Sequence, residues 1–191
     1  VFDGTKNGPY TEHDRPCPIN AYGRSKLAGE EAVRDSGASH LIFRTSWVYA
    51  ARGSNFVRTM LRLARERPEL RIVSDQVGAP TSARSIAEMT AQVLKDAARA
   101  GKNSGLYHFT AAGAVSWFGF AEAIFAETAR RFADFKAPRL VPIPASEYPT
   151  PARRPANSRL DCSKLTATFN IAPPSWEAAL RQCLGELENS E

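Results

Sequence analysis

Short apolar runs that alternate with longer segments of helical periodicity constrain the fold of this chain most. Residues 40–45 form such a run directly after the turn signal Ser36-Gly37, and this pattern predicts a buried strand. Similar runs predict strands at residues 70–74 and 106–110, and a short one at 159–160. The remaining periodic segments predict helices at residues 20–33, from 55 to Pro68, from 81 or 82 onward, 116–132, 163–169 and 175–187. Such alternation indicates an α/β protein with mainly parallel strand pairing.

Three of the predicted helices carry apolar residues at helical spacing, which identifies a candidate core. These core candidates are Val57, Met60, Leu61 and Ala64, then Ile86, Met89, Val93 and Ala97, and finally Phe120, Ile124 and Phe125. Residues 142–158 hold five prolines, so we expect this stretch to be irregular throughout. A loop of this length inside a compact domain is usually functional or disordered.

The composition of the 191-residue chain argues against several classes of function. The net charge is +5, but Glu66 and Glu69 interrupt the basic stretch at residues 58–71 and no aromatic residues interleave for base stacking. We therefore expect a solvated helix face and no nucleic-acid partner. No apolar run approaches the roughly 20 residues that a membrane crossing needs. The three cysteines show no C-x-x-C pair and no metal-ligand spacing, which predicts no metal site and a reducing, cytoplasmic setting.

Tyr22 and Lys26 lie four residues apart in a predicted helix, so their side chains share one helical face. A phenol beside an ammonium suits an enzyme that must hand a proton to a carbonyl oxygen. The phenol of free tyrosine ionises only near pH ~10, and a neighbouring cation helps it to do so. On spacing alone, however, such a pair is more often a half-buried aromatic ring beside a solvated lysine.

The motifs around this pair narrow the interpretation. Blocks of residues that span the chain from residue 1 to about residue 160 resemble, in order, the dTDP-4-dehydrorhamnose reductase family of the extended short-chain dehydrogenase/reductase superfamily. These blocks are Val1-Phe2-Asp3-Gly4-Thr5, Tyr10-Thr11-Glu12, Pro18-Ile19-Asn20, Tyr22 to Glu30, Arg44-Thr45-Ser46-Trp47-Val48-Tyr49, Ser54-Asn55-Phe56, Asp75-Gln76-Val77-Gly78-Ala79-Pro80-Thr81 and residues 149–158.

The resemblance implies that the complete protein uses NADPH or NADH to reduce dTDP-4-dehydro-β-L-rhamnose to dTDP-β-L-rhamnose, a step toward O-antigen lipopolysaccharide. Tyr22 would protonate the substrate oxygen and Lys26 would bind the nicotinamide ribose, so both are expected to be catalytic and cofactor-binding. Trp47 would contact the deoxysugar, with its flat ring against the sugar face and methyl group, although a tryptophan after a strand is more often a packing residue. Some family members pair through a magnesium-dependent interface, so Mg²⁺ and a homodimer are further expectations.

The glycines set a limit on what the chain can bind. No two of them are separated by a single residue, so a G-x-G-x-x-G turn for a dinucleotide pyrophosphate cannot occur. We therefore expect a C-terminal part of an extended reductase whose glycine-rich half, with a third catalytic Thr or Ser, precedes Val1. Residues 1–50 would be the remnant of a Rossmann-like NAD(P)-binding domain, and residues 51–191 mostly the smaller substrate-binding lobe. Such a portion is expected to be inactive alone and not to bind the dinucleotide.

Two other functions use the same opening motifs. One is a non-catalytic binding subunit like the regulatory subunit of methionine adenosyltransferase, and the other is an epimerase or dehydratase of the extended superfamily. The blocks at residues 44–49 and 75–81 favour the reductase family over both. Several polar residues stay open between roles: Asn55 as a helix cap, Gln76 and Pro80 as loop-shaping residues, and Arg153 and Arg154 as pyrophosphate ligands or solvated arginines.

Overall fold

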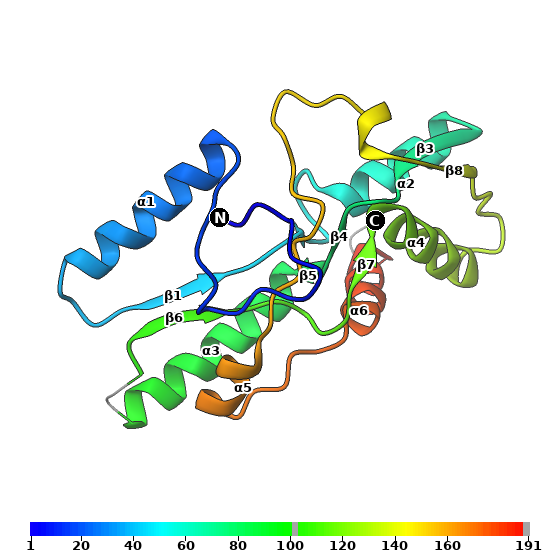
Figure 1. Ribbon diagram of the computed structural model, residues 1–191. Coiled ribbons are helices and arrows are strands. Elements are labelled where there is room, and N and C mark those ends of the chain that lie inside the picture. The colour runs from blue at the N-terminus through cyan, green and yellow to red at the C-terminus, as the bar shows by residue number, and fades with distance from the viewer. Residues whose placement is uncertain (101–102, 189–191) are drawn as a thin grey trace.

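The computed structural model describes residues 1–100 and 103–188, and of residues 97–100 and 188 it describes the backbone only (Figure 1). Helices and short strands alternate along the chain, as the sequence predicts. The helices are α1 (Ala21–Asp35), α2 (Phe56–Glu66), α3 (Ala83–Ala100), α4 (Trp117–Arg131), the 3₁₀ turn η1 (Ala145–Glu147), α5 (Ser163–Phe169) and α6 (Trp176–Glu188). The strands are β1 (Leu41–Arg44), β2 (Val48–Tyr49), β3 (Glu69–Val73), β4 (Val77–Gly78), β5 (Thr81–Ser82), β6 (Gly105–His108), β7 (Val115–Ser116) and β8 (Arg139–Ile143).

The strands pair two by two, and most pairs are parallel. Within the described residues, β1 pairs with β6, β2 with β5 and β3 with β8 in parallel, whereas β4 and β7 are antiparallel. The α/β class with mainly parallel pairing is therefore confirmed. None of the helices in these ranges combines the length and hydropathy that a membrane crossing requires.

Two hydrophobic clusters hold the elements together. The larger cluster lies among α2, β3, α4 and α6 and includes the predicted core residues Val57, Met60, Phe120, Ile124 and Phe125. The smaller cluster lies among β6, α3 and α5, beside β1. Figure 1 shows the two groups side by side, with the N-terminal loop and the short strands between them. The predicted domain limits at residue 50 stay a prediction.

Most predicted core positions are confirmed in these clusters. Met89 and Val93 are buried, while Leu61, Ala64 and Ile86 are partly buried and pack against the clusters. The side chain of Ala97 lies outside the described residues. Helix capping also follows the sequence, because Asn55 accepts a hydrogen bond from the Arg58 N–H and Ser116 accepts one from the Gly119 N–H. The helix expected from residue 81 or 82 begins instead at Ala83, since Thr81 and Ser82 pair with β2.

The prediction that residues 142–158 are irregular throughout is wrong at the N-terminal end. Pro142 and Ile143 belong to β8, and η1 follows. Arg139 donates its backbone N–H to the Pro68 carbonyl, and the Ile143 carbonyl accepts from the Ser74 N–H. The odd-numbered residues of β8 therefore direct their backbone hydrogen-bonding groups toward β3. Pro142 therefore faces away from β3, where its missing N–H breaks no ladder bond.

Helix α1 is attached to the rest of the molecule mainly by polar contacts. Only Gly23 is buried among its residues, and a side chain there would meet Pro18 at 2.9 Å. Its second attachment is an ion pair in which Arg44 Nε and Nη2 donate to the two carboxylate oxygens of Glu30, at 2.8 and 2.6 Å. Both side chains of this pair are at most 10% exposed. A buried bidentate pair of this kind fixes the orientation of a helix that has little apolar surface to bury.

Replacing Glu30 by Ala should destabilise the protein by about 3–5 kcal/mol, because the Arg44 charge would be left buried without its partner. Urea unfolding checks this, with hydrogen exchange of the α1 amides as a local measure. The matched control is Glu66→Ala, which removes the partner of Arg62 in a pair that is 61% and 48% exposed. That change should cost about 0.5 kcal/mol or less. Equal losses in the two variants would contradict the anchoring role of Glu30.

Candidate active site

The predicted pair Tyr22–Lys26 lies on one exposed face of the first turns of α1. The Lys26 ammonium is 5.4 Å from the centre of the Tyr22 ring, and Tyr22 is 71% exposed. The helix begins here because Asn20 caps it by accepting the Gly23 N–H at 2.8 Å. Within the described residues, neither the phenol nor the ammonium makes a hydrogen bond, so both polar groups are open to a ligand.

The same cap connects α1 to the proline-rich loop. The Asn20 side-chain amide donates to the Arg153 carbonyl at 2.8 Å, which holds the loop beside the N-terminus of the helix. The side chains of Arg153 and Arg154 are exposed. Two arginines near a helix N-terminus would suit an anionic group, and solvated arginines would look the same. The structure leaves both interpretations open.

Trp47 occupies a strained and enclosed position between β1 and β2. Its φ of +49° lies in the left-handed region, where a bulky residue costs about 1–2 kcal/mol. Its indole stacks on that of Trp117, with ring centroids 3.6 Å apart and planes inclined by 8°. A Cβ placed on Gly78 would lie 2.6 Å from Trp47 Cε2, so the Gly78 backbone also lies close to the ring. Backbone strain of this kind clusters at functional sites.

The motif at residues 75–81 frames this tryptophan. The Thr81 N–H donates to the Trp47 carbonyl at 3.2 Å, and Ser46 Oγ donates to the Ala79 carbonyl at 3.2 Å. Pro80 is fully buried and Gln76 half-buried, which agrees with the loop-shaping role for Pro80. Gly78 has no Cβ, and that absence makes room for the Trp47 ring.

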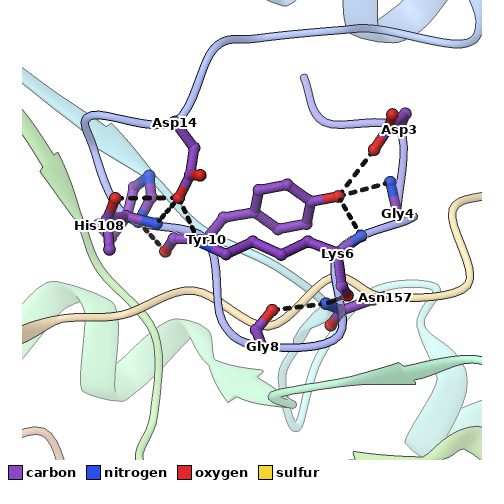
Figure 2. A network of polar contacts seen from close by, with 9 residues as sticks. Asp3, Gly4, Lys6, Gly8, Tyr10, Asp14, His108 and Asn157 are labelled. Atoms are coloured by element: carbon purple, nitrogen blue, oxygen red, sulfur yellow. Dashed lines mark hydrogen bonds and ion pairs between the residues drawn. The ribbon is translucent and has the colours of Figure 1, made fainter.

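A polar network joins the N-terminal loop to the C-terminal end of the proline-rich loop, residues 142–158 (Figure 2). The side-chain amide of Asn157 donates to the carbonyls of Lys6 and Gly8, at 2.7 and 2.8 Å. The Tyr10 hydroxyl donates to Asp3 at 2.8 Å and accepts the N–H groups of Gly4 and Lys6. Asn157 is 7% exposed, so the two segments are joined by bonds that water hardly competes for.

His108 is the buried end of the same network. Its backbone N–H donates to Glu12 Oε1 at 2.7 Å, and its ring Nδ1 lies 2.9 Å from the Tyr10 carbonyl oxygen. A carbonyl only accepts, so Nδ1 carries the hydrogen; within the described residues Nε2 has no partner. Burial lowers the pKa of His108, the charge of Arg44 adds to the lowering, and Glu12 and the Tyr10 and Asp161 carbonyls oppose it.

The structure does not bring the three predicted site residues into one set of contacts. No hydrogen bond or ring contact within the described ranges joins Trp47 to Tyr22 or Lys26. Two cavities, of about 680 and 1010 Å³, lie elsewhere: one between residues 110–114 and 159–163, the other between α2 and residues 128–136. Across the same ranges, no group of three or more His, Cys, Asp or Glu residues could hold a metal ion.

Sequence patterns missed several residues of this region. Trp117 lies in the helix expected at residues 116–132, where its position indicates no role of its own, and the three histidines are too far apart in the sequence to indicate a site. Asn157 and Gly78 stood inside the quoted motifs without a role of their own. Their contacts join segments that are far apart along the chain, and spacing within a motif does not reveal such contacts.

These features define a class, the extended short-chain dehydrogenase/reductase fold. They are the alternation of strands and helices, the capped helix α1 with its Tyr–Lys pair, and the stacked indoles of Trp47 and Trp117. UDP-glucuronic acid 4-epimerase from Bacillus cereus shares this fold, with a TM-score of 0.75 over 99% of this chain and 59% of that chain at 19% identity. The model of the RmlD substrate binding domain matches residues 1–189. The chain belongs to this family.

Several relatives in the family bear the same name, dTDP-4-dehydrorhamnose reductase. A dTDP-4-dehydrorhamnose reductase from Burkholderia thailandensis is 55% identical over 98% of this chain and 65% of its own length. The reductase of the same name from Escherichia coli K12 is 44% identical over 98% of this chain and 62% of its own. The solved dTDP-4-dehydrorhamnose reductase from Bacillus anthracis, in complex with NADP, has a TM-score of 0.87 at 36% identity, over 97% of this chain and 62% of that one. The chain thus spans somewhat less than two thirds of these relatives.

The stability of the protein should fall as the pH drops from about 7.5 to 5, because His108 is buried neutral. Its folded pKa lies below the unfolded value of ~6.5, so the unfolded chain binds the proton first. Replacement by Asn keeps a donor at the Nδ1 position and should flatten this part of the profile of unfolding free energy against pH. The paired carboxylate of Asp14, whose pKa is lowered to about 2, affects the unfolding free energy only at lower pH.

The control is His13→Asn, which alters an exposed histidine and should leave the slope of this profile unchanged. A slope that stays unchanged in His108→Asn would contradict the conclusion that His108 is buried neutral.

Proposed function

We propose that this chain is the substrate-binding and catalytic portion of an NAD(P)H-dependent reductase that converts dTDP-4-dehydro-β-L-rhamnose to dTDP-β-L-rhamnose. The observation that carries the proposal is the exposed Tyr22–Lys26 pair on one face of α1, with both polar groups unbonded within the described residues. The relatives named dTDP-4-dehydrorhamnose reductase support the substrate class. A non-catalytic subunit with the same opening motifs would also carry this pair, and the motifs at residues 44–49 and 75–81 favour the reductase over it.

Tyr22 and Lys26 would divide the chemistry between them. Negative charge develops on the substrate oxygen as its carbonyl is reduced, and Tyr22 donates the proton that neutralises it, an effect typically worth roughly 10²–10⁴ in rate. Lys26 lies within reach of the phenol ring, so its charge favours the ionised phenol that is left after the transfer. Helix α1 keeps the two groups at fixed spacing, and the Arg44–Glu30 pair keeps the helix in place.

The exposed face of α1 also fits a nicotinamide ribose. Lys26 Nζ offers three donors and Tyr22 Oη one more, which suits vicinal hydroxyls. A bound reduced nicotinamide would supply the hydride. The choice between NADPH and NADH, the magnesium-dependent homodimer, the cytoplasmic location and the role in O-antigen synthesis stay predictions, as do the domain limits.

Trp47 would contact the deoxysugar. Arg153 and Arg154, on the loop that Asn20 holds beside α1, would meet the pyrophosphate of the sugar nucleotide. The half-buried indole is held by strained backbone and by Trp117, as expected for a residue that presents a fixed apolar surface to a ligand. The epimerase-like fold neighbours carry no argument about the reaction, because their identity is below a fifth or close to it.

In the complete reductase, Tyr22→Phe should lower kcat by roughly 10²–10⁴ with little change in affinity for the sugar nucleotide. The ring remains and only the proton donor is lost. Steady-state kinetics with dTDP-4-dehydrorhamnose measure this. Tyr148→Phe, which removes another exposed phenol hydroxyl, is the matched control and should keep the parent kcat. An unchanged kcat in Tyr22→Phe would make Tyr22 a surface residue only.

Trp47→Ala should weaken binding of dTDP-rhamnose by about 1–3 kcal/mol while binding of dTDP stays nearly the same. The indole would touch the sugar, and the nucleotide would bind elsewhere. Calorimetric titration of both ligands gives the comparison, and a melting curve excludes general unfolding. If both ligands weaken equally, Trp47 supports the fold and does not read the sugar.

A further inference from the structure

The indole of Trp47 is enclosed on both of its flat faces. A Cβ on Gly78 would lie 2.6, 2.8 and 3.0 Å from Cε2, Nε1 and Cδ2, which places it over the ring and not beside its rim. Trp117 stacks at 3.6 Å yet is not among the atoms nearest to that Cβ. Trp117 and Gly78 therefore lie on opposite faces of Trp47.

The short β4–β7 strand pair positions both residues that cover Trp47, namely Gly78 and Trp117. Gly78 of β4 pairs with Val115 of β7, and Trp117 follows two residues later as the first residue of α4. Ser116 caps that helix, so the start of α4 is fixed relative to the ladder. Phe56, at 4.6 Å from Trp117, connects the stack to the larger hydrophobic cluster.

Trp47 cannot leave this enclosure by a backbone rotation. Its left-handed φ, its carbonyl bond to Thr81 and the adjoining pair Val48–Thr81 hold the main chain on both sides of the ring. The faces are covered, so a ligand meets only the edge of the indole. That edge includes the Nε1–H, which donates no hydrogen bond within the residues that the structure describes. This differs from the flat-face contact expected from the sequence.

We propose that Trp117 and Gly78 are positioning residues that hold Trp47 edge-on to the 6-deoxysugar. The inference rests on the proposed function and deepens it, because it states which part of Trp47 meets the sugar and what fixes it there. Trp117 stacks on the indole, so its effect on sugar binding is expected to pass through Trp47. An edge fixed on two sides offers an apolar rim and one N–H donor to a deoxyhexose.

The test is a double-mutant cycle in the complete reductase. Trp117→Leu should raise KM for dTDP-4-dehydrorhamnose about three- to tenfold, the loss expected for one aromatic stack, and leave KM for the nicotinamide dinucleotide unchanged. Trp117→Phe, which keeps a ring for stacking, should recover most of the affinity. In a Trp47→Leu background, Trp117→Leu should add less than twofold. Phe118→Leu, the neighbouring half-buried aromatic on α4, is the matched control and should leave both KM values unchanged.

Gly78→Ala tests the other face. The added methyl group must displace the ring, so KM for the sugar nucleotide should rise as in Trp117→Leu, and it should not rise further in the Trp47→Leu background. The stack itself is read without activity, from the exciton couplet that two stacked indoles give in far-ultraviolet circular dichroism. Trp117→Leu and Trp47→Leu should each abolish that couplet, and Phe118→Leu should keep it.

The outcomes separate the two proposals. If the parent enzyme reduces the sugar nucleotide but Trp117→Leu keeps its KM, or if the Trp117 and Trp47 effects simply add, the positioning role is overturned and the reductase function stands. If the complete parent enzyme does not reduce dTDP-4-dehydrorhamnose, the proposed function fails, and the positioning inference built on it fails with it. A couplet absent from the parent overturns the stack whatever the activity.

Discussion

The buried ion pair between Arg44 and Glu30 is the interaction on which the candidate site depends. Helix α1 buries only Gly23, so apolar contact contributes little to holding it. Arg44 meets Glu30 through two hydrogen bonds, and its guanidinium lies 5.0 Å from the Phe2 ring. In the β1–β6 ladder the same residue pairs with His108. One arginine thus joins the helix and the N-terminal loop through its guanidinium and the sheet through its backbone.

The physical character of this pair matters for function. A buried pair gains little net stability over an apolar equivalent, but it permits few alternative geometries. An apolar face could slide along the strand by a residue, whereas a bidentate pair admits a single register. Helix α1 must hold Tyr22 and Lys26 at fixed positions, and a hydrogen-bonded ion pair fixes its orientation better than an apolar contact would.

The enclosure of Trp47 is built on a different principle. Trp47 is held by close packing between the indole of Trp117 and the backbone of Gly78. Its strain is supported by the adjoining β2–β5 pair and by the cluster behind Phe56 and Trp117. Close packing of this kind transmits a change of a single methyl group, so Gly78 is as constrained as the tryptophan that it faces.

The sequence predicted what local physics determines. The helices, the cap at Asn55, and the spacing of Tyr22 and Lys26 follow from the nearest few residues. The two-residue strands β2, β4, β5 and β7 could not be predicted, because so short a segment has no period of its own. The sequence predicts no strand at β8, because a proline on the free side of an edge strand resembles a loop residue.

The contacts of the site that were missed are long-range ones. His108 gave no signal in its spacing, because its partners Glu12 and Tyr10 are about a hundred residues earlier. Trp117 belongs to a helix that the sequence predicts, but nothing in that helical pattern indicates that its indole stacks on Trp47. The family resemblance placed Trp47 near the sugar, but only the three-dimensional arrangement shows which part of its ring is free.

The bonds from Asn157 to the N-terminal loop have a consequence for the order of folding. They span 151 and 149 residues, so this loop has contacts of very high order. A ribosome that adds about 5–20 residues per second reaches Asn157 on the order of ten seconds after it has made Lys6. Until then, Phe2 and Tyr10 lack the segment that closes over them. The first loop of the chain is therefore among the last to lock, and newly made protein should pass through a stage in which proteases and chaperones can reach it.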